Sequence, residues 1–394
     1  YCANDVIATE AVWNYLQGDW AARKILVKLA NKLCPEILST ENDTTNTLST
    51  RIIFGTNKEP QSEFCYRNLA EPVKSLSDEV SEYLKTYTRV KPKFKPYWCD
   101  GPESLLPYFP GYEYDEFKHE STYRGIDPSE GGRVYSKPGI YYDVDLMDIE
   151  SMHPSSAEDE CAFGPQYTRR FSDVKRCRIK VKHEDFDGID QFLDGVLIDI
   201  VKDIESEDIN SGDLSNALKT VINSVYGLKS ASFSNPFKDP RNKDNIIAKR
   251  GALFMIDLQL YCEEKGYNVI HIKTDSIKIA DSTPEIREDI MQFGEMYGYH
   301  FEHEATYERL CLINKAVYVA KDASDGHWTA TGKEFQVPYV FKTLFTDDEI
   351  EPKDLVEVFN CKTALYLDYN ESMGEDEHSY HFVGRTGAFY PIIS

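Results

Sequence analysis

The spacing of apolar residues predicts helices at the start of the chain and again in its middle. In residues 1–35 the large apolar side chains recur every three to five positions, and Pro35 ends the run. These side chains are Trp13, Leu16, Trp20, Ile25 and Leu29. Similar spacing predicts further helices near residues 189–204, 213–227 and 243–265.

Alternation of apolar and polar residues predicts strands at residues 140–148, 176–183 and 268–280. The last of these consists of two β-rich runs around a polar tip at Asp275, which is typical of a hairpin although no Asn-Gly pair marks the turn. In the second, four basic residues alternate with apolar ones, which predicts a strand with one basic and one apolar face. The basic residues are Arg176, Arg178, Lys180 and Lys182.

The remaining segments are less regular. Residues 36–125 contain many prolines, which predicts short elements and a linker. Residues 331–394 are predicted to form aromatic strands around an acidic, helix-like section near residues 346–360. Because 394 residues exceed one compact core, we expect two or three domains.

Composition excludes several classes of protein. A hydrophobic content of 41% argues against general disorder, and no apolar run approaches the ~20 residues that span a bilayer. The nine cysteines form no CxxC pair, which argues against zinc-ribbon and iron–sulfur sites and fits reduced thiols. With no signal peptide at its start, the chain is predicted to be a soluble cytoplasmic protein that does not enter a membrane.

The net charge of -23 argues against a nucleic-acid partner unless basic residues are concentrated locally. Besides the alternating segment 176–183, two other groups are basic: Arg89, Lys91, Lys93 and Lys95, and then Arg241, Lys243, Lys249 and Arg250. Each group could bind phosphates, and each could equally be a solvated face.

A first candidate for chemistry lies where the strand at 140–148 ends. Pro154 suits the first turn of a helix, so Asp148 is predicted at a strand end facing a helix N-terminus. The free amides of such a terminus bind anions such as a triphosphate. A carboxylate beside a phosphate requires a cation between them, for which Mg²⁺ is the usual choice.

Two further segments could complete this site. On a helix, Lys219, Asn223 and Tyr226 form one stripe that could offset phosphate charge and present a flat ring to a base pair, while Gly227 allows close backbone approach. Asp275 at the predicted hairpin tip is the natural second carboxylate. The alternatives are a turn or cap role for each Asp and a solvated face for the stripe.

Together and in this order, these segments resemble the three polymerase motifs of family B DNA polymerases, in a form typical of bacteriophage enzymes. Asp148–Ser155 matches DxxSLYPS at the Asp, the Ser, the Pro and the final Ser. Lys219–Gly227 matches KxxxNSxYG at every fixed position, and Lys273–Ser276 matches the last three residues of DTDS. Weaker resemblances are Gly131 and Gly132 to YxGG, Phe301–Glu304 to an acidic strand, Lys315 and Tyr318 to KKxY, and Tyr1 and Asp5 to the third exonuclease motif.

The resemblance implies an α+β fold with the right-hand architecture of polymerases: an antiparallel-sheet palm, a short helical fingers hairpin and a partial thumb. It implies the end of an exonuclease domain plus a linker at 1–125, palm at 126–185 and 241–335, fingers at 186–240 and thumb at 336–394. The chain is therefore expected to be a fragment without proofreading activity. Primer-template DNA and dNTPs are the implied partners of a monomer, with processivity or replisome partners left open.

The resemblance also implies roles for individual residues. Two Mg²⁺ ions, replaceable by Mn²⁺, would be held by Asp148, Asp275 and the Ile149 carbonyl. The nucleotide would be bound by Ser151, Met152, His153, Lys219, Asn223 and Tyr226. The DNA primer would be bound by Gly131, Gly132, Thr274, Lys315 and Tyr318.

The chain departs from the family pattern at several positions. His153 replaces the tyrosine that blocks a ribonucleotide 2'-hydroxyl, which predicts weaker discrimination between dNTPs and rNTPs. Lys273 replaces the first Asp of DTDS, while Ser129 and Ala316 replace the YxGG tyrosine and the second KKxY lysine. The arginine and lysine expected on the first fingers helix are not evident, with Lys202 a weak candidate. The gaps between motifs are too short for the insertions of protein-primed members, so a nucleic-acid primer is expected.

Two other functions remain open at this point. One is a metal-dependent nuclease that uses Asp5 and other carboxylates, which leaves the Lys219–Asn223–Tyr226 stripe unexplained. The other is a catalytically inactive, DNA-binding polymerase remnant, which Lys273 and the acidic composition would fit. A zinc site at His300 and His303 is rejected, because residues three apart on the predicted strand point to opposite faces.

Overall fold

A computed structural model describes residues 2–57, 112–115, 120–129, 131–159, 162–205, 210–231, 233, 235, 246–332, 338–368 and 378–389. Its α-helices are α1 (Cys2–Tyr15), α2 (Gln17–Leu33), α3 (Thr45–Phe54), α5 (Met152–Asp159), α6 (Gly164–Lys182), α7 (Val196–Glu205), α8 (Ser211–Ser230), α9 (Ile246–Glu264), α10 (Pro284–Met296) and α12 (Pro338–Phe345). Its strands are β1 (Tyr112–Asp115), β2 (Glu120–Tyr123), β3 (Val134–Ser136), β4 (Gly139–Ile149), β5 (Asn268–Lys273), β6 (Ser276–Ala280), β7 (Phe301–Leu312), β8 (Tyr318–Asp322), β9 (Trp328–Thr331), β10 (Glu357–Asp368) and β11 (Tyr380–Phe389). Short 3₁₀ helices span Ile189–Gln191, Leu193–Gly195 and Pro352–Leu355.

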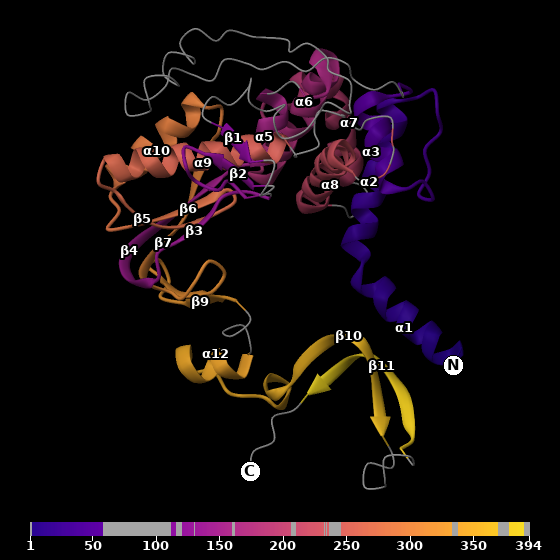
Figure 1. Cartoon of the computed structure of the whole chain (residues 1–394). Coiled ribbons are helices and arrows are strands. Elements are labelled where there is room, and N and C mark those ends of the chain that lie inside the picture. The colour runs from indigo at the N-terminus through magenta and orange to yellow at the C-terminus, as the bar shows by residue number, and fades with distance from the viewer. Residues whose placement is uncertain are drawn as a thin grey trace.

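The centre of the molecule is a curled, antiparallel sheet of seven strands in the order β3-β5-β6-β4-β7-β8-β9 (Figure 1). Strand β4 lies in the middle and pairs with β6 on one side and with β7 on the other. Segments more than 100 residues apart in sequence are thereby brought into register, with Asp148 opposite both Ser276 and Glu302.

The two faces of the sheet have different surroundings. Met147, Ile277 and Ile279 point to the face that α9 and α10 cover, where they pack against residues such as Phe254 and Phe293. The other face carries a smaller apolar cluster. Val144 and Leu146 belong to that smaller cluster. Because side chains alternate along a strand, Asp148 points to the face away from α9 and α10.

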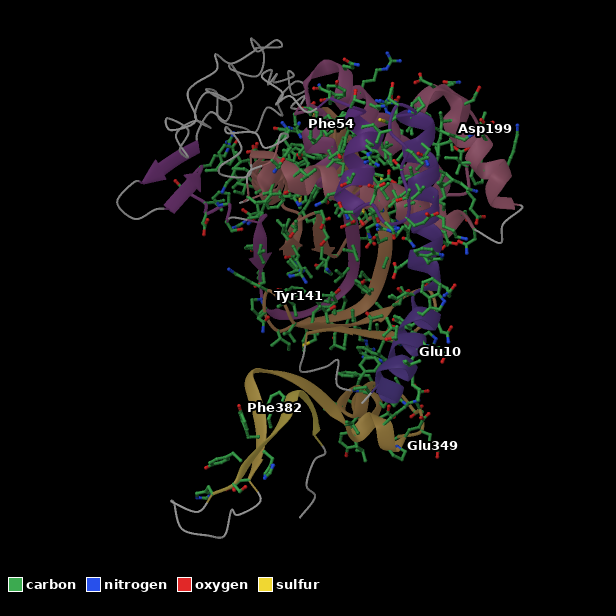
Figure 2. All side chains as sticks on the ribbon, turned by 90° about the vertical axis from the view of Figure 1, so that its right-hand side faces the viewer. Glu10, Phe54, Tyr141, Asp199, Glu349 and Phe382 are labelled. Carbon is green, nitrogen blue, oxygen red and sulfur yellow. The ribbon has the colours of Figure 1, made fainter. Side chains whose placement is uncertain are left out.

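A second core is mainly helical and lies beside the sheet (Figure 1). Helix α8 packs against α2, α3 and α6, and its first turn is closed by a capping box between Asn210 and Asp213. Figure 2 shows Phe54, which is 2% exposed, within this helical cluster and Phe382 on the separate β10–β11 hairpin. Helix α1 extends away from the cluster (Figure 1).

The prediction of a strand at residues 176–183 is wrong, because this segment is the last part of helix α6. Its buried residues are Phe171, Val174, Cys177 and Val181. Their spacing of three and four is helical. A window of eight residues contained too little of this pattern, and the local alternation of basic residues was misleading. The four basic residues therefore spread over several sides of a helix.

The third basic group is also not the surface track that its sequence suggested. Lys249 and Arg250 on α9 are only 5% and 2% exposed. Arg250 forms an ion pair with Asp159 (2.8 Å), stacks over Tyr299 and donates to the Tyr297 carbonyl. This buried cation ties α9 to α5. Arg241 and Lys243 lie outside the described residues, as does the whole group from Arg89 to Lys95.

Most other predicted elements are confirmed. The strand at 140–148 is β4, the hairpin at 268–280 is β5–β6, and the helices at the N-terminus and near 213–227 and 243–265 are present. The stretch 189–204 contains short 3₁₀ turns followed by α7. The helix expected near 346–360 is wrong, since only Pro352–Leu355 is 3₁₀-helical and β10 begins at Glu357. The α+β fold class is confirmed.

No helix in the ranges given above is long and apolar enough to cross a membrane.

Candidate active site

The backbone places Asp148 and Asp275 side by side. Asp148 ends β4 opposite Ser276 of β6, and the next residue, Ile149, donates its amide to the carbonyl oxygen of Asp275 at 2.9 Å. Asp275 lies in the tight turn between β5 and β6, where Thr274 adopts a left-handed conformation with a φ of 58°. Two aspartates separated by 127 positions in sequence therefore lie at the same end of the sheet.

The electrostatics of Asp148 indicate a concentration of negative charge. Burial, and after it the charges of Asp275, Glu304 and Glu302, together raise the pKa of Asp148 to about 7, while Lys182 opposes the shift. The ordinary value is 3.8. Clustered carboxylates of this kind are the donor set that Mg²⁺ prefers, so the residues present fit the predicted metal site.

This shift has a consequence for stability in metal-free buffer. Folded Asp148 keeps its proton to a higher pH than the unfolded chain does, so the free energy of unfolding should fall as the pH rises from about 4 through about 7. Asp148 is partly exposed, so solvent screening limits the expected fall to on the order of 1 kcal/mol. Thermal melts at about pH 5 and about pH 8 should show this loss in the wild type and a smaller loss in Asp148→Asn. An equal loss in both proteins would contradict it.

The turn after β4 leads into α5 through a left-handed residue, Ser151, with a φ of 59°. The hydroxyl of Ser151 accepts a hydrogen bond at 2.9 Å from Nη1 of Arg178, which reaches over from α6. Met152 has a buried side chain in the core between α9 and the sheet, which leaves its main chain as the part able to meet a nucleotide. Pro154 lies in the first turn of α5, as its position after Asp148 predicted.

His153 and Tyr226 form a stacked pair that joins α5 to α8. Their rings are 5.3 Å apart and parallel to within 1°. Burial lowers the pKa of His153, so the imidazole is neutral at neutral pH. Lys219 and Asn223 are exposed on α8 in the same stripe as Tyr226. The structure thus brings His153 and Tyr226 together and leaves the polar ends of the stripe open to solvent.

The residues predicted to bind the primer lie mainly in the turns and loops that flank the neighbouring strands. Gly132 has a φ of 136°, and a Cβ there would lie 2.9 Å from Cγ2 of Thr274, so only glycine allows the segment to pass this close to the Asp275 turn. The Thr274 amide donates to the Arg133 carbonyl at 2.9 Å. Gly131 lies next to this contact and has open space around its Cα.

The ring of Tyr318 on β8 forms a cation–π contact with a buried lysine. The Lys278 ammonium lies 4.6 Å from the centre of the Tyr318 ring, and burial lowers its pKa to about 8. His271 Nε2 lies 3.1 Å from the backbone carbonyl oxygen of Lys315, and Lys315 itself is an exposed residue. Burial lowers the pKa of His271 to about 4, so this ring is a neutral donor to that carbonyl.

Sequence reasoning did not place several charged residues around Asp148, although it named Arg178 and Lys182 as part of a basic segment. Helix α6 presents Arg178 and Lys182 one turn apart, and Lys182 forms an ion pair with Glu302 at 2.9 Å. Glu150 and His183 also lie near Glu302. A helical reading of residues 171–181 would have placed Arg178 and Lys182 on one face, whereas nothing in the sequence points to His183.

Other predicted residues are not part of this cluster or lie outside the described residues. Lys202 is exposed on α7. Tyr1 is outside the described residues, and so is the side chain of Asp5, so the exonuclease remnant stays a prediction. His300 and His303 have different partners, Glu295 at 2.6 Å and Asp145 at 3.1 Å respectively.

Comparison with known proteins gives one structural similarity. No family model matches the chain, and no curated protein matches it. Among solved structures the chain is similar to one described as the structure of the family B DNA polymerase from the hyperthermophilic archaeon Pyrobaculum calidifontis, with 13% sequence identity and a TM-score of 0.44. The match covers 98% of this chain and 50% of that one, so the chain spans about half the length of that polymerase.

Proposed function

We propose that the chain is a template-directed DNA polymerase that transfers deoxynucleotidyl groups from dNTPs to a primer 3'-hydroxyl. The observation that carries the proposal is the pairing of Asp148 with Asp275 at one sheet edge, where their mutual repulsion contributes to the raised pKa of Asp148. Both aspartates belong to segments that resemble polymerase motifs. A structural turn or cap role would not require two neighbouring carboxylates whose charges, with those of Glu302 and Glu304, raise the pKa of Asp148.

Asp148, Asp275 and the Ile149 carbonyl are the proposed ligands for Mg²⁺. When bound, a pair of such ions supplies Lewis-acid activation of the attacking hydroxyl and stabilisation of the leaving oxygen. The backbone supports this proposal by joining the two segments, because the Ile149 amide donates to the Asp275 carbonyl. The remaining residues then have to bind, orient and neutralise the triphosphate.

Three cations are proposed for that task. Lys219 lies on the exposed stripe of α8, as the motif resemblance implies. Arg178 and Lys182 on α6 are proposed as the arginine and lysine that the sequence did not reveal. Arg178 already donates to Ser151 and its buried Nε has no hydrogen-bond partner among the described residues, so it has a donor available for a phosphate oxygen.

Primer extension tests the proposal. The chain is incubated with a labelled primer annealed to DNA template, dNTPs and Mg²⁺, and products are resolved by length. Lengthening that follows the template sequence is the expected result. Shortening of the primer, as a nuclease would produce, or retention of the DNA without any change in length, as an inactive remnant would produce, would each overturn it.

His153 is the residue proposed to face the sugar of the incoming nucleotide. Its imidazole is smaller than a tyrosine ring, so His153→Tyr should increase discrimination against ribonucleotides by roughly 10-fold or more. The measurement is the ratio of kcat/KM for a dNTP to that for the matching rNTP, with His300→Tyr as a control at an exposed histidine. Equal ratios in the wild type and His153→Tyr would reject this role.

A further inference from the structure

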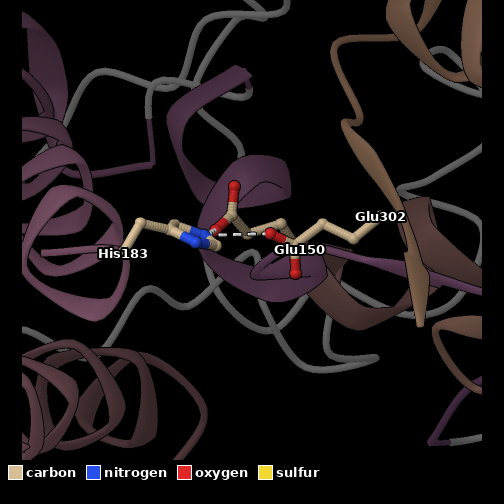
Figure 3. Close-up of side chains that lie close together, drawn as sticks. All are labelled: Glu150, His183 and Glu302. Atoms are coloured by element: carbon tan, nitrogen blue, oxygen red, sulfur yellow. Dashed lines mark ion pairs between the residues drawn. The ribbon is translucent and has the colours of Figure 1, made fainter. Parts of the chain in front are cut away.

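A cluster of three side chains joins α6 to the sheet beside the candidate active site. Figure 3 shows His183 at the C-terminal end of α6 facing Glu150, from the turn after β4, and Glu302 of β7. One ligand atom from each residue lies within 4.8 Å of the other two. His183 Nε2 is 3.0 Å from Glu302 Oε1 and 3.5 Å from Glu150 Oε1.

Glu150 is the unusual member of this cluster. Its side chain is only 8% exposed, yet its buried Oε1 accepts no hydrogen bond from any described residue. That oxygen points to the imidazole and the second carboxylate (Figure 3). A buried carboxylate oxygen without a donor is unfavourable by a few kcal/mol. The Arg178 guanidinium interacts electrostatically with Glu150 but donates no hydrogen bond to this oxygen. The sequence offers no reason for an acidic residue in this buried place.

We propose that Glu150, His183 and Glu302 bind a divalent transition-metal ion, of which Zn²⁺ is the representative, at a site distinct from the proposed Mg²⁺ pair. Imidazole nitrogen and carboxylate oxygens bind Zn²⁺ at about 2.0–2.2 Å, which places neighbouring ligand atoms about 3.4 Å apart around a tetrahedral ion. The separations of 3.0 and 3.5 Å bracket this value. Mg²⁺ is a poor competitor for an imidazole nitrogen.

The ligands come from three elements that are far apart in sequence. A bound ion would connect the end of α6 to β7 and to the turn that leads from Asp148 to α5. It would also neutralise Glu302, which now forms an ion pair with Lys182. Lys182 would then be released toward a phosphate, so this part of the inference rests on the proposed function, whereas binding of the ion does not.

Co²⁺ is a spectroscopic substitute for Zn²⁺, and its titration in excess Mg²⁺ tests the site directly. We expect the wild-type chain to bind one more equivalent of Co²⁺ than His183→Ala or Glu150→Gln, with d–d absorption and no thiolate charge-transfer band from that equivalent. Zn²⁺ should displace it and should raise the Tm of the wild type but not of His183→Ala. His300→Ala, at an exposed histidine outside the cluster, should bind as the wild type does.

A further variant separates this site from the proposed polymerase centre. Asp275→Asn should retain the Co²⁺ equivalent even if it has lost primer extension. Loss of the equivalent in Asp275→Asn, or its retention in both His183→Ala and Glu150→Gln, would overturn the proposal. Circular dichroism of each variant establishes that it is folded, and the more conservative His183→Gln replaces His183→Ala if that variant is not.

Discussion

Asp148→Asn and Asp275→Asn are each expected to lower the rate of primer extension by roughly 10³-fold or more. Each change removes a negative charge from the proposed Mg²⁺ ligands, and metal stabilisation of a phosphoryl-transfer transition state amounts to several kcal/mol, at 1.36 kcal/mol per factor of ten. The side chains keep their size, so the sheet edge should keep its shape. Relief of the repulsion around Asp148 should make the metal-free Asp148→Asn protein at least as stable as the wild type at neutral pH.

The measurement is the single-turnover rate with saturating dNTP, together with DNA affinity from a gel-shift or anisotropy titration. Binding of primer-template DNA should change little, which separates lost chemistry from lost structure. Asp281→Asn is the matched control, because Asp281 is an exposed aspartate at the far end of β6. Synthesis within about 10-fold of the wild type in either active-site variant would exclude that aspartate as a required metal ligand.

Arg178→Ala is expected to raise the KM for dNTPs by roughly 10- to 100-fold. A hydrogen bond from a guanidinium to a phosphate contributes about 1.5–3 kcal/mol, and the partly buried setting of Arg178 strengthens it. Burial lowers the pKa of Arg178, but its ordinary value of 12.5 is so high that the side chain remains a cation at neutral pH. The change should affect the KM for dNTPs much more than the affinity for DNA.

Arg176 provides the matched control on the same helix. It is half-exposed and pairs with Glu158 at 3.0 Å, so Arg176→Ala should leave the KM for dNTPs nearly unchanged. Steady-state extension of one nucleotide over a range of dNTP concentrations gives both values. Equal KM values in the two variants would remove Arg178 from the nucleotide site.

Local patterns predicted the parts of the candidate site that lie within one segment. Alternation identified β4 and the β5–β6 hairpin, which places Asp148 at a strand end and Asp275 in a turn. The stripe of Lys219, Asn223 and Tyr226 lies on α8 as its spacing predicted. These features depend on neighbouring residues in sequence, so periodicity was sufficient to find them.

Features that depend on tertiary packing were not predictable in the same way. Arg178 and Lys182 were assigned to a strand, because alternation over eight residues outweighed the helical spacing of the buried residues before them. Arg250 was taken for a surface cation, although its partner Asp159 lies 91 positions away. The Glu150–His183–Glu302 cluster combines three distant segments and has no local signal at all.

Strand β4 carries Asp148 and is hydrogen-bonded on both sides, to β6 and to β7. Its amides are hydrogen-bonded to one neighbour or the other along its paired length, so we expect hydrogen exchange in β4 to be among the slowest in the protein. Asp148 therefore lies at the end of a strand that is held on both sides, so we expect little backbone motion at this acidic end of the sheet.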